Sequence, residues 1–254
     1  MSKMRFLITR PQDQADKLIE LITRAGHKAV RLPAIEIRNI SLSAATISML
    51  GKLDEFAFAI FISANAVHKA ADFIKKYTTS PRLNDYFKIA VIGPSTAKAL
   101  EVYGWQVDII SDGKYDSEGL LQALKPFVAK NDKIIIFRGL GGRRVLAEGL
   151  QKMGVRVAEA PVYERTLPKV NNSELAKIFT NNSLDAILTM SNESLRNLYT
   201  LAGTKYKRSL LASKLVVLNQ RCANLAKSLG FKNPAIIARA PDESSIFEAL
   251  MQAG

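Results

Sequence analysis

The sequence predicts an α/β protein of two doubly wound, parallel-sheet lobes that come from an internal duplication and are joined by a two-stranded β connector. Two observations carry this prediction. Short apolar runs alternate with amphipathic helical segments, and the second half of the chain repeats the first. Hydrophobic residues make up 48% of the 254 residues, which is enough material for a buried core.

The apolar runs are rich in β-branched and aromatic residues, which is typical of buried parallel strands. They are Phe6–Thr9, Ala57–Ile62, Lys88–Ile92, Ile134–Phe137, Ala186–Thr189 and Leu215–Leu218. Between them lie helical segments that end at a glycine: Gln14–Ala25, Ser95–Tyr103 and Arg143–Met153. This alternation predicts a mostly parallel sheet with helices on both faces.

The repeat relates the two halves of the chain by a nearly constant offset. Arg138 follows Arg10 by 128 positions, and the same offset relates Ser63 to Ser191. Further on the offset becomes 126, as between Gly104 and Gly230. A constant offset that changes once indicates a duplicated unit with a two-residue deletion.

Two equivalent segments of the repeat are extended and carry a proline, at about 29–37 and 157–166. Pro33 and Pro161 discourage helix and central-strand positions, so the segments could lie side by side as a connector. Residues 1–37 and 166–254 would then form a discontinuous lobe one, and residues 38–165 would form lobe two. Two simple consecutive domains would give the same duplication.

The composition limits the classes of function. The formal charge of +13 favours an anionic partner, although a generally basic surface gives the same balance. The longest apolar run, Phe56 to Ile62, is far shorter than the roughly 20 residues that span a bilayer. A single cysteine, Cys222, fits a reducing cytosol, and with His27 and His68 far apart in sequence a zinc site is not expected. We therefore expect a cytoplasmic protein without a metal.

Candidate ligand-binding residues are those that follow the predicted strands, because ligands of open α/β sheets bind beyond the carboxyl ends of the strands. These residues include Arg10, Ser63, Thr96, Arg138, Ser191 and Arg221. Ser63 and Ser191 are equally well explained as helix N-caps. This alternative is weaker for Thr96, because Gly93 and Pro94 already shape its turn.

The segment Arg138–Arg143 is the most informative of these turns. It follows a strand, opens a helix, and has glycines at positions 139, 141 and 142. Glycines let backbone amides approach an anion, and arginines add charge and forked donors. The segment lacks the third glycine of a dinucleotide fingerprint and is not a P-loop. It predicts a site for carboxylates or a simple phosphate, with a purely structural turn as the alternative.

Tyr163 breaks the symmetry of the repeat, because the equivalent residue of the first copy is Ile35. The tyrosine could pack at a hinge with its hydroxyl in solvent. Alternatively, its phenol could project between the lobes and donate a hydrogen bond to a leaving group.

Taken in order, the motifs resemble the uroporphyrinogen-III synthase family over essentially the whole chain. The matching segments are Ile8-Thr9-Arg10-Pro11 with Gln14-Ala15, Gly26-His27, Phe61–Val67, Val91–Ala97, Ser117–Leu121, Arg138–Arg143 and Pro161–Arg165. The resemblance implies two α/β lobes joined by a two-stranded ladder, with the active site in the cleft. It also implies conversion of linear hydroxymethylbilane to uroporphyrinogen III, with inversion of ring D and loss of water, without metal or organic cofactor.

Residue roles follow from the same resemblance. Tyr163 would lie near the departing hydroxyl and Thr96 would be a hydroxyl of the cleft. The residues that would bind carboxylates of the substrate are Arg10, Ser63, Arg138, Gly141, Gly142 and Ser191. The family's second Gly-x-x-Thr-Ala turn reads Asn219-Gln220-Arg221-Cys222-Ala223 here, so Arg221 could serve as an additional clamp.

The expected partner is a polycarboxylate tetrapyrrole, with no nucleic acid and no membrane, bound by a monomer that hydroxymethylbilane synthase could supply with substrate. Two other classes stay open. A two-lobed anion receptor would share the fold, but it would normally carry a signal sequence, and Phe6–Ile8 is too short an apolar core for one. A basic nucleic-acid binder would explain the charge, but no aromatic RNA-binding motif, zinc spacing or basic arm is seen.

Overall fold

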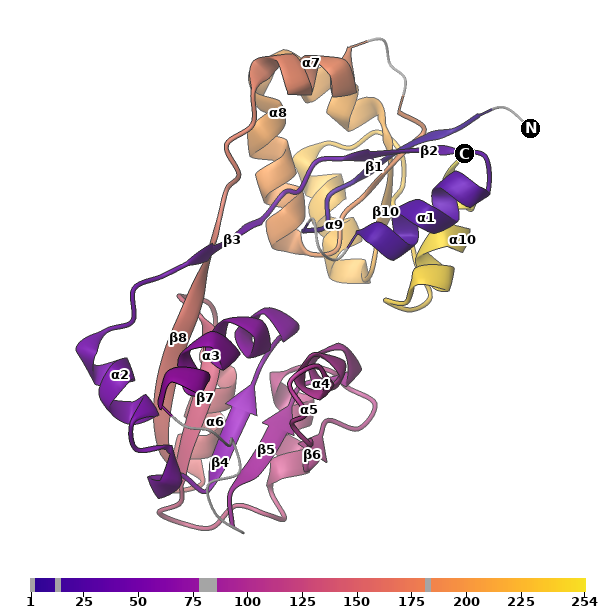
Figure 1. The fold of residues 1–254 in the computed structure, drawn as a ribbon. Coiled ribbons are helices and arrows are strands. Elements are labelled where there is room, and N and C mark those ends of the chain that lie inside the picture. The colour runs from indigo at the N-terminus through magenta and orange to yellow at the C-terminus, as the bar shows by residue number, and fades with distance from the viewer. Residues whose placement is uncertain (1–2, 12–14, 78–85, 181–183) are drawn as a thin grey trace. The chain divides into compact units, whose positions relative to one another are not determined.

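The computed structural model describes residues 3–11, 15–77, 86–180 and 184–254. The chain divides into two compact units (Figure 1). Unit 1 contains Met1–Glu36 and Thr166–Gly254, and unit 2 contains Ile37–Arg165. The predicted division, after residues 37 and 165, differs from this one by a single residue at the first crossing. Gln14, the first residue of a predicted helix, lies outside the described residues.

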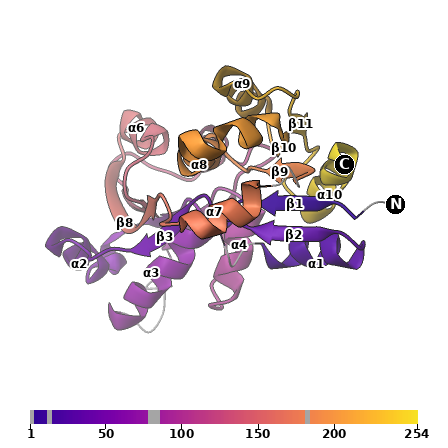
Figure 2. The ribbon, with the colours of Figure 1, turned by 90° about the horizontal axis from the view of Figure 1, so that it is seen from above.

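Unit 1 contains a five-stranded sheet in the order β11-β10-β9-β1-β2, and every one of these pairings is parallel. The strands are β1 (Arg5–Ile8), β2 (Lys28–Arg31), β9 (Ala186–Leu188), β10 (Lys214–Val217) and β11 (Ile236–Ile237). The helices are α1 (Asp16–Arg24), α7 (Asn172–Phe179), α8 (Asn192–Ala212), α9 (Gln220–Leu229) and α10 (Glu243–Ala253). Helices cover both faces of the sheet, with α1 and α10 on one face and α8 and α9 on the other (Figure 2).

Alternation of side chains along the strands builds the two cores of unit 1. Leu7 faces the cluster formed with α7, α8 and α9, whereas its neighbours Phe6 and Ile8 face the cluster formed with α1 and α10. All three side chains are fully buried. A strand buried on both faces must be apolar at every position, which explains why this run showed no polar alternation.

Unit 2 contains a six-stranded sheet in the order β3-β8-β7-β4-β5-β6. Its strands are β3 (Glu36–Asn39), β4 (Phe58–Phe61), β5 (Lys88–Val91), β6 (Ile109–Ile110), β7 (Lys133–Gly139) and β8 (Arg156–Thr166). Its helices are α2 (Ala44–Leu50), the short 3-10 helix Leu53–Glu55, α3 (Ala64–Tyr77), α4 (Pro94–Glu101), α5 (Ser117–Leu124) and α6 (Val145–Lys152). α3 and α4 pack on one face of the sheet, and α5 and α6 pack on the other.

The two copies of the repeat exchange segments between the units. In unit 1, β1 and β2 come from the first copy and share a sheet with β9, β10 and β11 of the second, through the pairing of β1 with β9. In unit 2, β7 and β8 come from the second copy and pair with β4, β5 and β6 of the first. Both sheets therefore contain the same five-strand order, and unit 2 adds β3 at its edge.

The predicted two-stranded connector is confirmed as the neighbouring strands β3 and β8, but two of its details need correction. The segment 29–37 is not one strand, because β2 ends at Arg31 in the sheet of unit 1 and β3 begins at Glu36 in the sheet of unit 2. The other segment is the 11-residue strand β8, which lies between β3 and β7, so Pro161 does occupy a central strand. The strand tolerates Pro161 because its pairing with β7 shifts register between Arg138 and Gly139, where a proline without an N–H costs least.

Candidate functional site

The strand order predicts that a ligand binds at the edge of each sheet that is formed by the carboxyl ends of its strands. Along the chain, successive strands are added first to one side of the sheet and then to the other. This reversal falls between β1 and β9 in unit 1, and between β7 and β4 in unit 2. Ligands of open α/β sheets bind beyond the carboxyl ends of the strands at such a reversal. Arg10 and Ser191 follow the two strands at this point in unit 1. In unit 2, Ser63 follows β4, and Arg138 is the penultimate residue of β7.

The glycine loop after β7 is held in shape from inside by Arg138. The Nη2 of this arginine donates to the carbonyl oxygens of Gly141 at 2.6 Å and Arg143 at 3.1 Å. Gly141 and Gly142 have φ values of 74° and 84°, a conformation that glycine adopts without strain. The loop is exposed, so the backbone N–H groups of Gly141 and Gly142 are available to a ligand.

The charge of Arg138 is neutralised within the protein. Its Nη1 lies 2.9 Å from Oε2 of Glu159, while Oε1 of the same carboxylate lies 2.8 Å from Nε of Arg144. The hydrogen bond that Arg144 donates to Glu159 raises the pKa of Arg144 above its ordinary value. Arg138 therefore positions the loop, and the groups displayed to solvent are the glycine amides, the exposed Arg143 and the exposed Arg144, which shares Glu159 with Arg138. Sequence analysis missed Glu159, which no spacing rule connects with the loop.

Tyr163 and Ser63 form a second feature of the same edge. Their hydroxyl oxygens are 3.1 Å apart, and either can donate to the other. The tyrosine is 2% exposed and packs so closely on Gly139 that a Cβ there would lie 2.9 Å from its ring. Ser63 also accepts a hydrogen bond from the backbone N–H of Ala66 at 3.1 Å, as an N-cap does. Ser63 is thus both a cap and a partner of the phenol.

Thr96 lies in the first turn of α4, which begins after Gly93. Thr96 is 3% exposed, and its hydroxyl takes part in none of the hydrogen bonds found within the described part of the chain. The side chain of Tyr115 crosses Gly93, where a Cβ would approach it to 3.2 Å, and Tyr115 is 54% exposed. Tyr115 was not among the predicted site residues, although an aromatic residue in the loop after a strand could have indicated one.

In unit 1 the equivalent arginine is used differently. Both carboxylate oxygens of Glu243, in the first turn of α10, lie within 2.9 Å of Nη1 of Arg10. Arg10 is 6% exposed, so its guanidinium is enclosed and paired. The predicted site residue Arg10 is thereby tied to a helix start.

Ser191 and Arg221 mark the other helix starts of unit 1. Ser191 caps α8 by accepting from the backbone N–H of Ser194 at 3.1 Å. Arg221 is exposed on the first turn of α9, whose cap is Asn219. Next to it Cys222 is buried, and burial raises the pKa of its thiol, which is consistent with a structural role.

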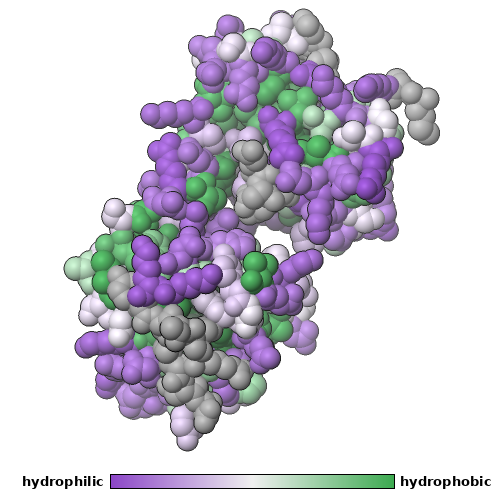
Figure 3. Space-filling view, viewed as in Figure 1, coloured by the Kyte–Doolittle hydropathy of each residue, from purple (hydrophilic) through white to green (hydrophobic). Residues whose placement is uncertain are grey.

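Some further features of the described residues bear on the choice of function. No group of three or more His, Cys, Asp or Glu in this part of the chain is arranged to hold a metal ion. No helix in the described ranges is both long and apolar enough to cross a membrane. The surface seen in Figure 3 is mostly hydrophilic, with smaller hydrophobic areas in each unit.

Comparison with known proteins gives consistent results. The family model of uroporphyrinogen-III synthase HemD matches residues 16–248. The uroporphyrinogen-III synthase of Escherichia coli is 28% identical over 249 residues, which cover 97% of this chain and 100% of the relative. That of Salmonella typhimurium is 28% identical over 253 residues, with the same coverage.

Two solved structures share the fold. Uroporphyrinogen-III synthetase from Helicobacter pylori aligns with a TM-score of 0.67 at 17% identity, over 99% of this chain and 100% of its own. A mutant uroporphyrinogen III synthase from Thermus thermophilus aligns with a TM-score of 0.63 at 13% identity, over 98% of both chains.

Proposed function

We propose that this chain, which belongs to the uroporphyrinogen-III synthase family, closes linear hydroxymethylbilane into uroporphyrinogen III with inversion of ring D and loss of water. Membership of the family makes the chain a cyclising lyase of tetrapyrrole biosynthesis. The observation that supports a polycarboxylate substrate best is the exposed glycine loop at the strand-order reversal of unit 2, in a chain with a net charge of +13.

We propose that this loop binds carboxylates through its backbone. Arg138 is paired with Glu159 and acts by holding Gly141 and Gly142 in their left-handed conformation, while their amides and Arg143 meet the ligand. Charge-assisted hydrogen bonds of this kind are about twice as strong as neutral ones. Ser191 and Arg221 would supply further carboxylate contacts at the helix starts of unit 1, and the paired Arg10 would support that edge.

We assign the phenol of Tyr163 to the departing hydroxyl. In the absence of substrate the phenol is bound to Ser63, so the leaving hydroxyl would take the place of Ser63 as its hydrogen-bond partner. A proton delivered there would let the hydroxyl depart as water and leave an azafulvenium cation, whose ring N–H proton can return to the phenolate to give the electrophilic azafulvene. Thr96, at the start of α4, would be a second hydroxyl that orients the substrate.

The remaining task is selectivity. Ring closure through the already substituted carbon of ring D passes a spiro intermediate and gives isomer III, whereas unaided closure gives isomer I. Binding several carboxylates at fixed positions can favour the first route without a strong acid or base. We therefore propose a reaction that needs no cofactor. We also propose that the protein is a monomer. We further propose that it lies in the cytoplasm, which the single cysteine supports.

Isomer analysis is the decisive experiment. Freshly made hydroxymethylbilane is incubated with the protein, oxidised, and separated into isomers I and III, beside a sample without protein. The expected product is isomer III in the presence of the protein and isomer I in its absence. A product that is only isomer I in both samples would overturn the proposal.

A further inference from the structure

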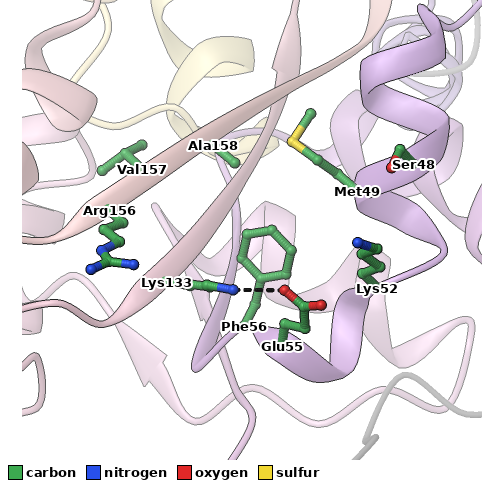
Figure 4. Close-up of a pocket in the computed structure, with 9 residues that line it drawn as sticks. All are labelled: Ser48, Met49, Lys52, Glu55, Phe56, Lys133, Arg156, Val157 and Ala158. Atoms are coloured by element: carbon green, nitrogen blue, oxygen red, sulfur yellow. Dashed lines mark hydrogen bonds and ion pairs between the residues drawn. The ribbon is translucent and has the colours of Figure 1, made fainter.

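A pocket of about 260 Å³ lies in unit 2 at the edge of the sheet opposite to the glycine loop (Figure 4). It is bordered by α2, the 3-10 helix Leu53–Glu55 and the amino ends of β7 and β8. Its apolar lining consists of Met49, Phe56, Val157 and Ala158. An apolar floor of this kind favours a ligand with a hydrophobic body.

The charged residues of this pocket leave an excess of positive charge. Lys133 and Glu55 form an ion pair of 2.6 Å, which keeps the pKa of Glu55 below its ordinary value. Lys52 and Arg156 are exposed, and no ion pair of either is recorded among the described residues. In Figure 4 these two cations stand on opposite sides of the Phe56 ring.

The duplicate shows how the same place looks in unit 1. Arg5 occupies the position equivalent to Lys133, and it donates to the carbonyl oxygens of Lys177 at 2.8 Å and Ile178 at 3.3 Å. These carbonyls end α7, the counterpart of α2. In unit 2, Lys133 instead donates a hydrogen bond to Glu55. No hydrogen bond from the start of β7 to the end of α2 is found among the described residues.

A second exchange between the copies affects the available space. Phe179 follows α7's last buried aliphatic residue, is 3% exposed and stacks on Tyr206. The equivalent residue in unit 2 is Gly51, where a Cβ would meet only backbone oxygens, at 3.7 Å or more. In its described residues, unit 2 thus has neither this large side chain nor the arginine bridge at the end of α2, the helix that borders the pocket.

We propose that this pocket binds a small aromatic monocarboxylate, with the ring on the Phe56 floor and the carboxylate at Lys52 or Arg156. Sites for drug-sized ligands measure about 300–1,000 Å³, so a space of 260 Å³ suits one or two rings and excludes a tetrapyrrole. The ligand is therefore distinct from the substrate of the glycine-loop edge. The Lys133–Glu55 pair is already neutral, so Lys52 and Arg156 are two excess cations, and one carboxylate can pair with either of them.

The test is a titration of the full-length, isotope-labelled protein with 2-naphthoate, followed by NMR. Amide shifts should concentrate at residues 48–56 and 156–158. The double variant Lys52→Gln/Arg156→Gln should raise the Kd at least about tenfold, the effect of losing a charge-assisted contact. Ala158→Leu, which fills the floor without changing charge, should also abolish binding.

The controls separate this site from general attraction to a basic protein. Lys28→Gln makes the matched exchange at the position of unit 1 equivalent to Arg156, and the Kd should stay within about twofold because Lys28 does not line the pocket and exposed charges are screened by salt. Shifts located elsewhere, an unchanged Kd in both pocket variants, or equally tight binding of neutral 2-naphthalenemethanol would each overturn the proposal. The isomer assay is independent of these results, so failure here leaves the proposed activity standing.

Discussion

The same arginine of the repeat serves two purposes in the two units. Arg10 follows β1 and is clamped by both carboxylate oxygens of Glu243, at the start of α10. Arg138 lies at the carboxyl end of β7 and holds a glycine loop open to solvent, with Glu159 of the neighbouring strand as its counter-ion. In unit 1 the arginine fastens a helix, whereas in unit 2 it presents backbone amides.

This difference shows how a duplicated fold acquires one specialised edge without changing its strand order. The features that differ are local. Two glycines with positive φ stand after Arg138, and a tyrosine replaces the equivalent Ile35. Tyr163 contributes a hydroxyl that the first copy lacks, beside the same loop.

The largest expected effect concerns the folding of the two units. Both cores of unit 2 are formed within residues 37–165, so this fragment should unfold cooperatively on its own. Residues 1–128 lack β7 and β8, which lie in the middle of that sheet, and should show no cooperative transition. Thermal melts followed by circular dichroism measure both. A cooperative transition in the fragment 1–128 would contradict the exchange of segments.

The next effect compares Arg138→Ala with Arg10→Ala. Arg10→Ala leaves the carboxylate of Glu243 without its partner, whereas Glu159 keeps Arg144 after Arg138→Ala. We expect Arg10→Ala to lower the free energy of unfolding by about 2–4 kcal/mol and Arg138→Ala by about 1–2 kcal/mol. Only Arg138→Ala also releases the glycine loop, so it should raise KM by the larger factor. Denaturant melts and steady-state kinetics provide the two numbers. Equal increases in KM would mean that both arginines serve the substrate alike.

Tyr163→Phe should slow the single-turnover rate by about 100-fold, the low end of what one general acid contributes, because this hydroxyl group leaves readily unaided. The product should remain isomer III, since the carboxylate contacts are intact. The matched control is Tyr206→Phe, a buried tyrosine of unit 1 whose hydroxyl donates to the carbonyl of Asn172 at 3.4 Å. An unchanged rate in Tyr163→Phe would reduce this residue to packing, and a change to isomer I would assign it to substrate orientation.

Gly142→Ala and Gly26→Ala form a matched pair, because both glycines have a φ of 84°. An alanine in this conformation costs about 1–2 kcal/mol at either position. At Gly142 the added methyl would also approach Nη2 of Arg138 to 3.4 Å, whereas nothing lies within 4 Å at Gly26. We expect similar losses of stability and a higher KM only for Gly142→Ala. A raised KM in Gly26→Ala would remove the special role of the loop.

The smallest effect is a pH dependence at the start of α10. The backbone N–H of Ser245 lowers the pKa of Asp242, and the hydroxyl of Ser245 lowers it further. A carboxyl group whose pKa is lower in the folded state stabilises the fold above its unfolded pKa, and this contribution is lost as the pH falls through the folded value. Asp242→Asn should therefore flatten the acid limb of a stability curve measured between about pH 6 and pH 2. Ser245→Ala should give an intermediate curve, and a curve like wild type for Asp242→Asn would contradict the assignment.

The strands and the duplication were readable because both depend on local apolar patterns. Runs such as Phe6–Ile8 are buried on both faces, so every position must be apolar and the pattern survives in the sequence. The offset of the repeat then paired the segments correctly, although it did not reveal that Pro161 lies in a central strand.

The candidate site was predictable in position but not in its contacts. Carboxyl ends of strands follow from topology, so Arg138 and Ser63 could be placed at one edge. Which carboxylate pairs with which arginine depends on long-range packing, since Glu159 lies on the neighbouring strand 21 residues from Arg138 and Glu243 begins a helix 233 residues from Arg10. No local pattern encodes such distances along the chain.

The exchange of segments affects the order in which the two units can fold during translation. All partners of unit 2 have been synthesised once residue 165 has emerged, so this unit can fold while translation continues. The strands β1 and β2 emerge first, but β1 pairs with β9, about 180 residues further on. The apolar amino-terminal strand therefore waits longest for its neighbour, and during that interval it is the part of the nascent chain that chaperones have most reason to shield.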